Sequence, residues 1–340
     1  MKNKKQDTLY CDVREDVIKS AHPILSMKTL RYLYQFINER YTIHVKKDVL
    51  HEPAPWTDDE VLATFRFTNV RREHDRETKW LIKHVTSNEA LSYKDKLLNA
   101  ILFRLFNKHE TSELIGMPIE FSKYGSSWDP EQYRKLFEDA LKEDPKRVFF
   151  TGAFHTVGMK MAFKQYIPKG VEDNSKEMRV MYFMKYLLDY DIYFWLTSDE
   201  METQEHCFNL LKNFTGIGDF LGYQIFVDMT YIKEFPFSEN EFTVAGPGCR
   251  MGLNYLFKDR VGMSYEECLF WVRDNIDRLF REKLNKPWDP DKLFVDLPEW
   301  DRHMNVMSLE NCFCELSKYI RAKEGTGRPR KVYKPSKEEL

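Results

Sequence analysis

Glycine is scarce in this sequence, at 14 of 340 residues, or about 4% against a usual ~7%. A turn-rich all-β architecture uses glycine in many of its turns, so this scarcity argues against one. Cysteine is scarce as well: the six cysteines include no CxxC pair, which argues against both a disulfide scaffold and a cysteine-based metal site. No apolar run approaches the ~18 residues of a membrane span, and the first residues lack the apolar core of a signal peptide. We therefore expect a reduced, cytoplasmic protein.

An excess of positive charge is also missing. Lys and Arg number 52 and Asp and Glu 54, for a formal net charge of -2. This balance excludes a uniformly basic surface for nucleic acid, but a local basic groove remains compatible with it, because phosphate neutralisation depends on where the charges lie. Basic residues do cluster near the C-terminus, between residues 318 and 337.

Aromatic residues, in contrast, are abundant at 15% of the chain, enough for a large core. Apolar residues recur at three- and four-residue spacing through most of the sequence, which predicts a mostly α fold. We expect at most a few short strands, and the best candidate is residues 146–152. Thr57 and Glu60 have capping-box spacing and predict a helix from Thr57 to about Asn69.

Residues 210–222 have the pattern of two helices joined by a tight turn that contains Gly216 and Gly218. Glycines allow the turn and a close backbone approach, so N–H groups at the start of the second helix can hold a phosphate. We predict that Gly216, Gly218 and the nearby Lys212 bind DNA. The alternative is an ordinary helical hairpin capped by glycine.

A second glycine-bearing turn, Gly246-Pro247-Gly248, precedes a helix and is followed by Arg250. Backbone N–H groups and a guanidinium in this order can bind an anion. We predict a phosphate site that includes Gly246, Gly248 and Arg250. The alternative is a simple loop between helices.

Residues 65–76 combine four arginines with Asn69, Glu73, His74 and Asp75. Arginine binds phosphate bidentately, and a carboxylate can take a proton or hold an amine. We therefore predict that phosphate binds Arg66 and Arg71, and that Asp75, Glu73 and Arg72 are catalytic. A structural ion-pair network is the alternative.

The C-terminal segment places Asn311 and Glu315 on one face of a helix over residues 308–323. Arg321, Arg328 and Arg330 then offer charges for the DNA backbone, although a solvated tail is as good an explanation. For Cys312 and Cys314 we expect a buried structural role.

Four blocks in this order resemble a known family. They are Phe67-x-Asn69-Val70-x-Arg72-Glu73-x-Asp75-Arg76, Gly216-Ile217-Gly218-x-Phe220-x-x-x-Gln224, Ala245-Gly246-Pro247-Gly248 and Cys314-Glu315-x-x-Lys318-Tyr319-x-Arg321. Over roughly residues 60 to 333, the chain resembles the phage α-glutamyl/putrescinyl-thymine pyrophosphorylases, also described as amino acid:DNA transferases. That family is similar in fold to helix-hairpin-helix DNA glycosylases.

The resemblance implies an enzyme of thymidine hypermodification that acts on double-stranded phage DNA after a DNA kinase has phosphorylated 5-hydroxymethyluracil. The transferase would displace the phosphate or pyrophosphate from the 5-methylene carbon with an amino acid or amine, such as glycine, serine or putrescine. It would work on a flipped base in the cytoplasm of the infected bacterium, protect viral DNA from host restriction, and need no metal or organic cofactor.

The sequence departs from the glycosylases where a transferase would differ from them. The carboxylate that usually follows the hairpin is replaced by Val244-Ala245-Gly246-Pro247-Gly248, and Asp219 stands near the place of the lyase-type lysine. Two alternatives remain: a glycosylase that uses another carboxylate, such as Asp228, and a non-catalytic DNA-binding module. By domain, we expect an N-terminal helical extension (1–56), a two-lobed glycosylase-like catalytic region (57–325) and a basic flexible tail (326–340).

Overall fold

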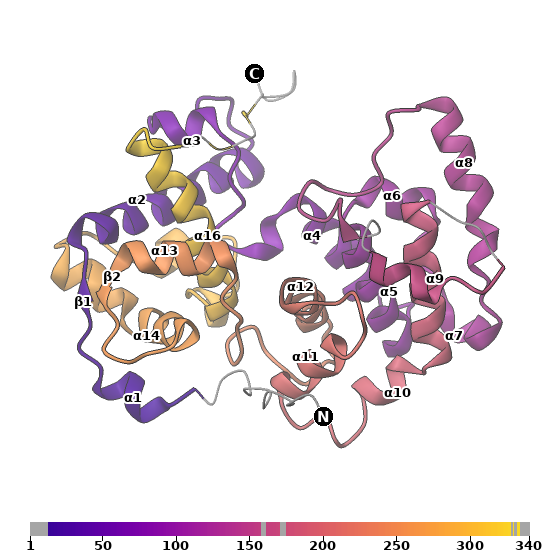
Figure 1. The fold of residues 1–340 in the computed structure, drawn as a ribbon. Helices are drawn as coiled ribbons and strands as arrows, with labels where there is room; N and C mark the ends of the chain where they lie inside the picture. Colours follow the sequence, from indigo (N-terminus) through magenta and orange to yellow (C-terminus); the bar gives the residue numbers. More distant parts are fainter. Residues whose placement is uncertain (1–12, 158–160, 171–174, 328, 330–331, 334–340) are drawn as a thin grey trace. The chain divides into compact units, whose positions relative to one another are not determined.

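The computed structural model describes residues 13–157, 161–170, 175–327, 329 and 332–333. Its regular structure is nearly all helical (Figure 1), which confirms the mostly α prediction. The described residues contain one antiparallel strand pair, β1 (Ile24–Leu25) with β2 (Phe257–Asp259). Among the described helices, none has the length and apolar character that a membrane span requires.

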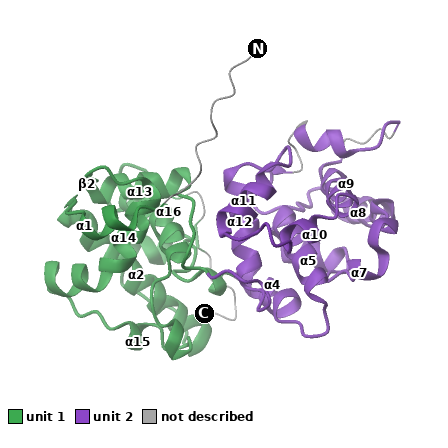
Figure 2. Cartoon of the chain, turned by 90° about the horizontal axis from the view of Figure 1, so that it is seen from below, with its two compact units in different colours: residues 1–75, 239–340 green, residues 76–238 purple. Residues whose placement is uncertain are grey.

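The chain divides into two compact units (Figure 2). Unit 1 is built from residues 1–75 together with 239–340, and unit 2 from residues 76–238. Unit 2 is therefore an insertion between two segments of unit 1. This division differs from the expected boundary near residue 56, because the helix over residues 27–44 shares one core with the C-terminal helices.

Unit 1 combines the helices of the two terminal segments. Its elements besides the strand pair are α1 (Glu15–Ser20), α2 (Met27–His44), the π-helix η1 (Val45–Val49), α3 (Glu60–Thr64), the 3-10 helix η2 (Arg72–His74), α13 (Pro247–Leu256), α14 (Tyr265–Arg278), the π-helix η8 (Leu279–Lys283), α15 (Pro290–Leu293), the 3-10 helix η9 (Glu299–Asp301) and α16 (Val306–Lys323). Its core joins α2, α13, α14 and α16.

The most extensive helix packing in unit 1 is between α13 and α16, and glycine allows a close approach there. A Cβ atom added to Gly252 would lie 2.2 Å from the carbonyl oxygen of Phe313, and one added to Gly248 would lie 2.5 Å from Sγ of Cys314. Gly248 and Gly252 are four residues apart and hence on one face of α13. The two helices can approach this closely because α13 has no side chain at these two positions.

We expect Gly252→Ala to lower the free energy of unfolding by about 1–3 kcal/mol, although alanine is the better helix former. The backbone carbonyl of Phe313 cannot move aside without separating the helices. Urea unfolding followed by circular dichroism measures the effect, and Met251→Ala, an exposed position of α13, is the control. A Gly252→Ala protein as stable as wild type would contradict the close approach.

The regular structure of unit 2 is entirely helical in its described residues. Its elements are α4 (Arg76–Leu81), the π-helix η3 (Ile82–Thr86), α5 (Tyr93–Phe106), α6 (His109–Leu114), α7 (Phe121–Tyr124), the 3-10 helices η4 (Gly125–Ser127), η5 (Pro130–Tyr133) and η7 (Met161–Tyr166), α8 (Arg134–Glu143), α9 (Lys176–Asp189), α10 (Ile192–Leu196), α11 (Gln204–Lys212) and α12 (Asp219–Thr230). Helix α5 is buried on all sides from Asp95 to Phe106 and packs against α12. It is the central helix of this unit.

Two local predictions were wrong. Residues 146–152 form no strand; the Thr111 hydroxyl donates to the carbonyl of Phe149 at 2.8 Å, and the side chain of Lys108 donates to the carbonyl of Val148. Side chains thus occupy the acceptors that a neighbouring strand would need.

The helix expected from Thr57 to Asn69 is the shorter α3, capped by Asp59, whose carboxylate accepts from the N–H groups of Val61 and Leu62. It ends at Thr64, because Phe65 is extended and forms a bridge with Val332. The tail predicted to be flexible therefore has two described residues, 332–333, that lie against this segment.

Candidate functional site

The arginine-rich segment and the C-terminal helix, which are far apart in the sequence, meet in unit 1. The side-chain amide of Asn311 on α16 donates to the carbonyl of Asn69 and to the hydroxyl of Thr68, both at 3.0 Å. Asn311 precedes the block Cys314–Arg321 on the same helix, so α16 connects that block to the block of residues 67–76. The segment runs from Asn69 through η2 to Asp75, the last residue before unit 2.

Asp75 is the carboxylate at the end of this segment, and Asn69 at its start holds it in place. Its Oδ1 accepts the backbone N–H of Asn69 at 2.8 Å and the side-chain amide of Asn69 at 3.3 Å. Loss of solvent raises the pKa of Asp75 to about 6, although the bond from Asn69 and the charges of Arg72 and Arg40 act in the opposite direction. A carboxylate with this pKa is ionised at pH 7 and still basic enough to accept a proton.

Arg72 and Glu310 form the next layer of this cluster. Both are buried, and Nη1 of Arg72 lies 3.9 Å from Oε2 of Glu310. Burial raises the pKa of Glu310, against the opposing effect of Arg72. The other carboxylate of α16 in this region, Glu315, is also buried and acts on both Asp75 and Glu310 through its charge.

The glycine turn before α13 already holds two carboxylates. The N–H of Gly246 donates to Glu310 at 3.2 Å, and the N–H of Ala245 donates to Glu266 at 3.0 Å. The N–H groups at this helix N-terminus thus bind anions, but these anions are carboxylates of the protein itself. Phosphate binding by Gly246 remains a prediction, and it requires that Glu310 give up this contact.

The other predicted phosphate ligands of the turn lie differently. Gly248 faces Cys314 of α16. Arg250 donates through Nε to the carbonyl of Ala245 at 2.8 Å, and its guanidinium lies over the ring of Tyr265. Its side chain remains 44% exposed, so it can still contact a ligand.

Arg71 is fully buried and joins three parts of unit 1. It donates to Glu73 at 2.7 Å, to the carboxylate of Asp301 at 2.6 Å and to the carbonyl of His303 at 2.7 Å, and it lies 4.0 Å from Glu239. These contacts match the structural ion-pair network considered above for this segment. A phosphate at Arg71 would have to displace such partners, whereas Arg66 is exposed.

The predicted DNA contacts are divided between the units. In unit 2, α11 and α12 pack against each other and are joined by the turn with Gly216 (φ +107°) and the exposed Gly218. Lys212 pairs with Asp219 across this turn at 2.7 Å. In unit 1, Arg321 donates to the carbonyl of Ser317, while Arg328 and Arg330 lie outside the described residues.

Asp228, the alternative glycosylase carboxylate, lies in the interior of unit 2. It has no exposed surface, and both of its oxygens accept from Arg104, one of them from Nε at 2.6 Å. Arg104 also donates to Asn107 at 2.7 Å. This paired arrangement is that of a structural ion pair rather than of an accessible catalytic group.

Residue spacing did not reveal Arg40, Glu266 or Glu310 as members of the cluster around Asp75. The predicted C-terminal helix already contained Glu310 and Glu315, and their presence on it was the one sequence feature that could have indicated their place in the cluster. Two further groups offer metal ligands within 4.8 Å of one another among the described residues: His44, His74 and Asp296 in unit 1, and Glu77, His109 and Glu110 in unit 2.

Comparison with known proteins identifies the family. Residues 27–328 match the family described as "5-hmdU DNA kinase, helical domain". The chain is 26% identical over 330 residues to the 5-hmdU DNA kinase of Bacillus phage SP10, a match that covers 92% of this chain and 48% of that protein. The chain thus spans about half the length of this relative. No solved structure matches this chain.

These matches confirm the broader expectation, a phage family of thymidine hypermodification, while the member named is a DNA kinase rather than a pyrophosphorylase or transferase. Because the match extends over most of the residues of both units, it does not depend on any single motif. The chain belongs to the 5-hmdU DNA kinase helical-domain family.

Proposed function

We propose that this chain acts on phage DNA that contains 5-hydroxymethyldeoxyuridine or its phosphorylated form, in the cytoplasm of the infected host. The support is the family match and the name of the relative from phage SP10. A modified base in double-stranded DNA is the substrate class that follows.

For the reaction itself we propose amine transfer to the 5-methylene carbon. An amino acid or amine attacks this carbon and forms a C–N or C–O bond, while the C–O bond to the phosphate breaks and the departing phosphate takes its electron pair. Asp75 accepts the proton that the nucleophile loses. The observation that carries this proposal is the position of Asp75, whose Oδ1 accepts the N–H of Asn69 at 2.8 Å; loss of solvent there raises its pKa to about 6, against the charges of Arg72 and Arg40.

Charge on the departing phosphate needs a cation or donor nearby. Arg72, whose present partner Glu310 lies at 3.9 Å, is the best candidate in unit 1. Arg66, Arg250 and the N–H groups of Gly246 and Gly248 are the further proposed ligands.

For DNA binding we propose the turn of Gly216 and Gly218 with Lys212, and the basic residues Arg321, Arg328 and Arg330. Extrusion of the modified base would expose it to the reaction, with aromatic side chains stacking on it. Phe220 is half-exposed and lies directly after the turn.

A second candidate is a DNA-binding helical module that serves the kinase reaction, and the family match favours it. The sequence contains no Gly-Lys pair and hence no GxxxxGK[ST] loop, the phosphate-binding loop of P-loop kinases. These residues therefore do not form the nucleotide site of a P-loop kinase.

One experiment separates these functions. Duplex DNA with 5-phosphomethyldeoxyuridine is incubated with the purified chain and glycine, serine or putrescine, and its nucleosides are then analysed by mass spectrometry. The transferase predicts an amine-modified nucleoside and free phosphate. Abasic sites would indicate a glycosylase instead, and tight binding without any new nucleoside would indicate the DNA-binding module.

A further inference from the structure

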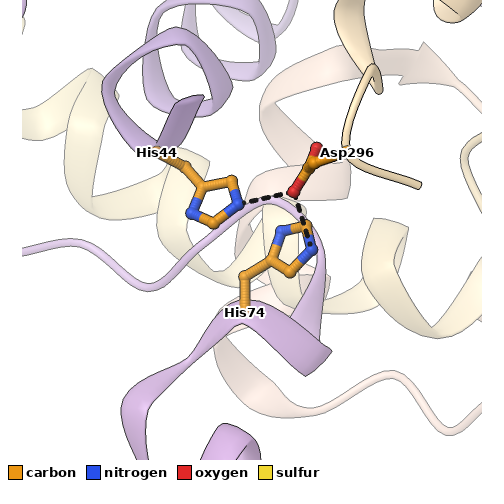
Figure 3. Close-up of side chains that lie close together, drawn as sticks. All are labelled: His44, His74 and Asp296. Carbon is orange, nitrogen blue, oxygen red and sulfur yellow. Dashed lines mark hydrogen bonds and ion pairs between the residues drawn. The ribbon is translucent and has the colours of Figure 1, made fainter. Parts of the chain in front are cut away.

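Two histidines and an aspartate converge in unit 1 beside the segment that contains Asp75 (Figure 3). His44 is the last residue of α2, His74 the last of η2, and Asp296 lies in the loop after α15. Nε2 of His44 lies 2.8 Å and Nε2 of His74 lies 3.4 Å from the same oxygen, Oδ2 of Asp296. The two imidazole rings stack with their centroids 4.0 Å apart.

Further side chains orient this group. Nδ1 of His44 lies 2.9 Å from a carboxylate oxygen of Asp48, and the hydroxyl of Tyr41 donates to Oδ1 of Asp296 at 2.5 Å. A histidine that binds a metal through one nitrogen usually donates its other N–H to a carboxylate, which fixes the tautomer and the ring orientation. His44 has this arrangement, with Asp48 as the outer carboxylate.

The arrangement also requires positive charge between the ring and Asp296. When Nδ1 of His44 donates its proton to Asp48, the lone pair of Nε2 faces the lone pairs of Oδ2 at 2.8 Å. Such a contact is favourable only with a proton or a metal ion at Nε2. His44 and His74 are less than 10% exposed, so water screens little of this repulsion.

We propose that His44, His74 and Asp296 form a divalent transition-metal site, with zinc as the ion that fits best. Imidazole nitrogens favour zinc and similar ions, whereas magnesium and calcium prefer oxygen ligands alone. A tetrahedral zinc ion with bonds of about 2.0–2.1 Å holds its ligand atoms roughly 3.4 Å apart. His74 and Asp296 already have this separation, whereas Nε2 of His44 lies 2.8 Å from Asp296 and must move outward. The two rings are stacked, and a metal binds in the plane of an imidazole, so metal binding also requires one ring to turn out of the stack.

A metal at this point would tie together three separate parts of unit 1: the end of α2, the segment before Asp75, and the loop before α16. Its role is structural, and the site does not depend on the proposed transferase reaction. The second group, Glu77, His109 and Glu110, has a single imidazole, and all three of its members are partly exposed. It therefore provides a matched control.

The test measures metal binding directly on the purified full chain. After removal of metals with a chelator, zinc is titrated by calorimetry, and cobalt is added to a second sample to record the visible absorption of a tetrahedral site. We expect about one zinc per chain and a rise in the thermal midpoint. His44→Ala and His74→Ala should abolish both, whereas His109→Ala should leave both unchanged.

Asp48→Asn offers a graded variant that retains all three ligands. Loss of the outer carboxylate should weaken zinc binding by about 10–100-fold without loss of the fold, which circular dichroism verifies. Zinc binding that is absent from the folded wild-type chain would overturn the proposal. So would binding that is equal in wild type, His44→Ala and His74→Ala.

Discussion

Asp75→Asn should lower kcat/KM of the proposed transfer by about 10²–10⁴-fold, the usual contribution of a general base. The amide keeps an oxygen to accept the N–H of Asn69, so the local fold is retained, but it cannot take a proton. The measurement is the rate at which the amine-modified nucleoside forms in duplex DNA. An Asp75→Asn variant that transfers at the wild-type rate would remove Asp75 from the mechanism.

The pH dependence gives this prediction a second readout. Since desolvation raises the pKa of Asp75 to about 6, kcat/KM should rise with pH through 6 and level off above it as the carboxylate ionises. The same raised pKa has the opposite effect on folding stability, which falls as pH rises. Its folded pKa lies above the ordinary value near 3.9, so Asp75 contributes stability at low pH that is lost as pH rises through 6. The amide of Asp75→Asn does not titrate, so this variant should not share the loss of thermal stability that the wild type shows between low pH and pH 8.

Glu73→Gln is the matched control, because Glu73 was the other predicted base. Glu73 pairs with the buried Arg71 at 2.7 Å, so its loss should reduce stability and leave the pH profile of the remaining activity unchanged. If Glu73→Gln abolished the rise of kcat/KM near pH 6 and Asp75→Asn did not, Glu73 would be the general base and Asp75 would have the structural role.

Asp228→Ala should destabilise unit 2 by about 3–5 kcal/mol, since it leaves the Arg104 guanidinium buried without its carboxylate. The effect should appear in the hydrogen exchange of unit 2 amides, which reports this unit separately. Asp139→Ala breaks an exposed pair with Lys142 on α8 and should change stability by less than about 1 kcal/mol.

A double variant separates the cost of an unpaired charge from the value of the pair. Arg104→Met with Asp228→Leu removes both charges and should recover most of the lost stability. Asp228→Ala that retained full stability would contradict a structural role and would revive Asp228 as a catalytic carboxylate for the glycosylase alternative.

Sequence periodicity predicted helices that bury one face, such as α11, whose residues Cys207, Phe208 and Leu211 are buried. The turn between α11 and α12 was also predictable, since its glycines and flanking helices are local features. The predicted strand at residues 146–152 was wrong because Phe149 packs against Phe137 of α8 and Phe150 against Phe106 of α5, instead of in a sheet.

The composition of the candidate site was only partly predictable. The density of charge in residues 65–76 marked Asp75 and Arg72, but the same density includes Arg71, which is a buried structural cation. Nothing in the spacing distinguishes the two arginines, because their difference depends on Asp301, His303 and Glu239 far along the chain. The approach of Asp296 to His44, 252 residues apart, had no local signal either.

The insertion of unit 2 has a consequence for the order in which the protein folds during synthesis. The apolar side chains of α2, such as Leu33 and Phe36, find their partners on α13 and α16 only after residues 76–238 have been translated. Translation from residue 76 to the end of α16 at Lys323 takes roughly 12–50 s at about 5–20 residues per second, and unit 2 can fold as one continuous segment during this time. The first segment of unit 1 therefore has to be kept from aggregating on the ribosome until the last helices emerge.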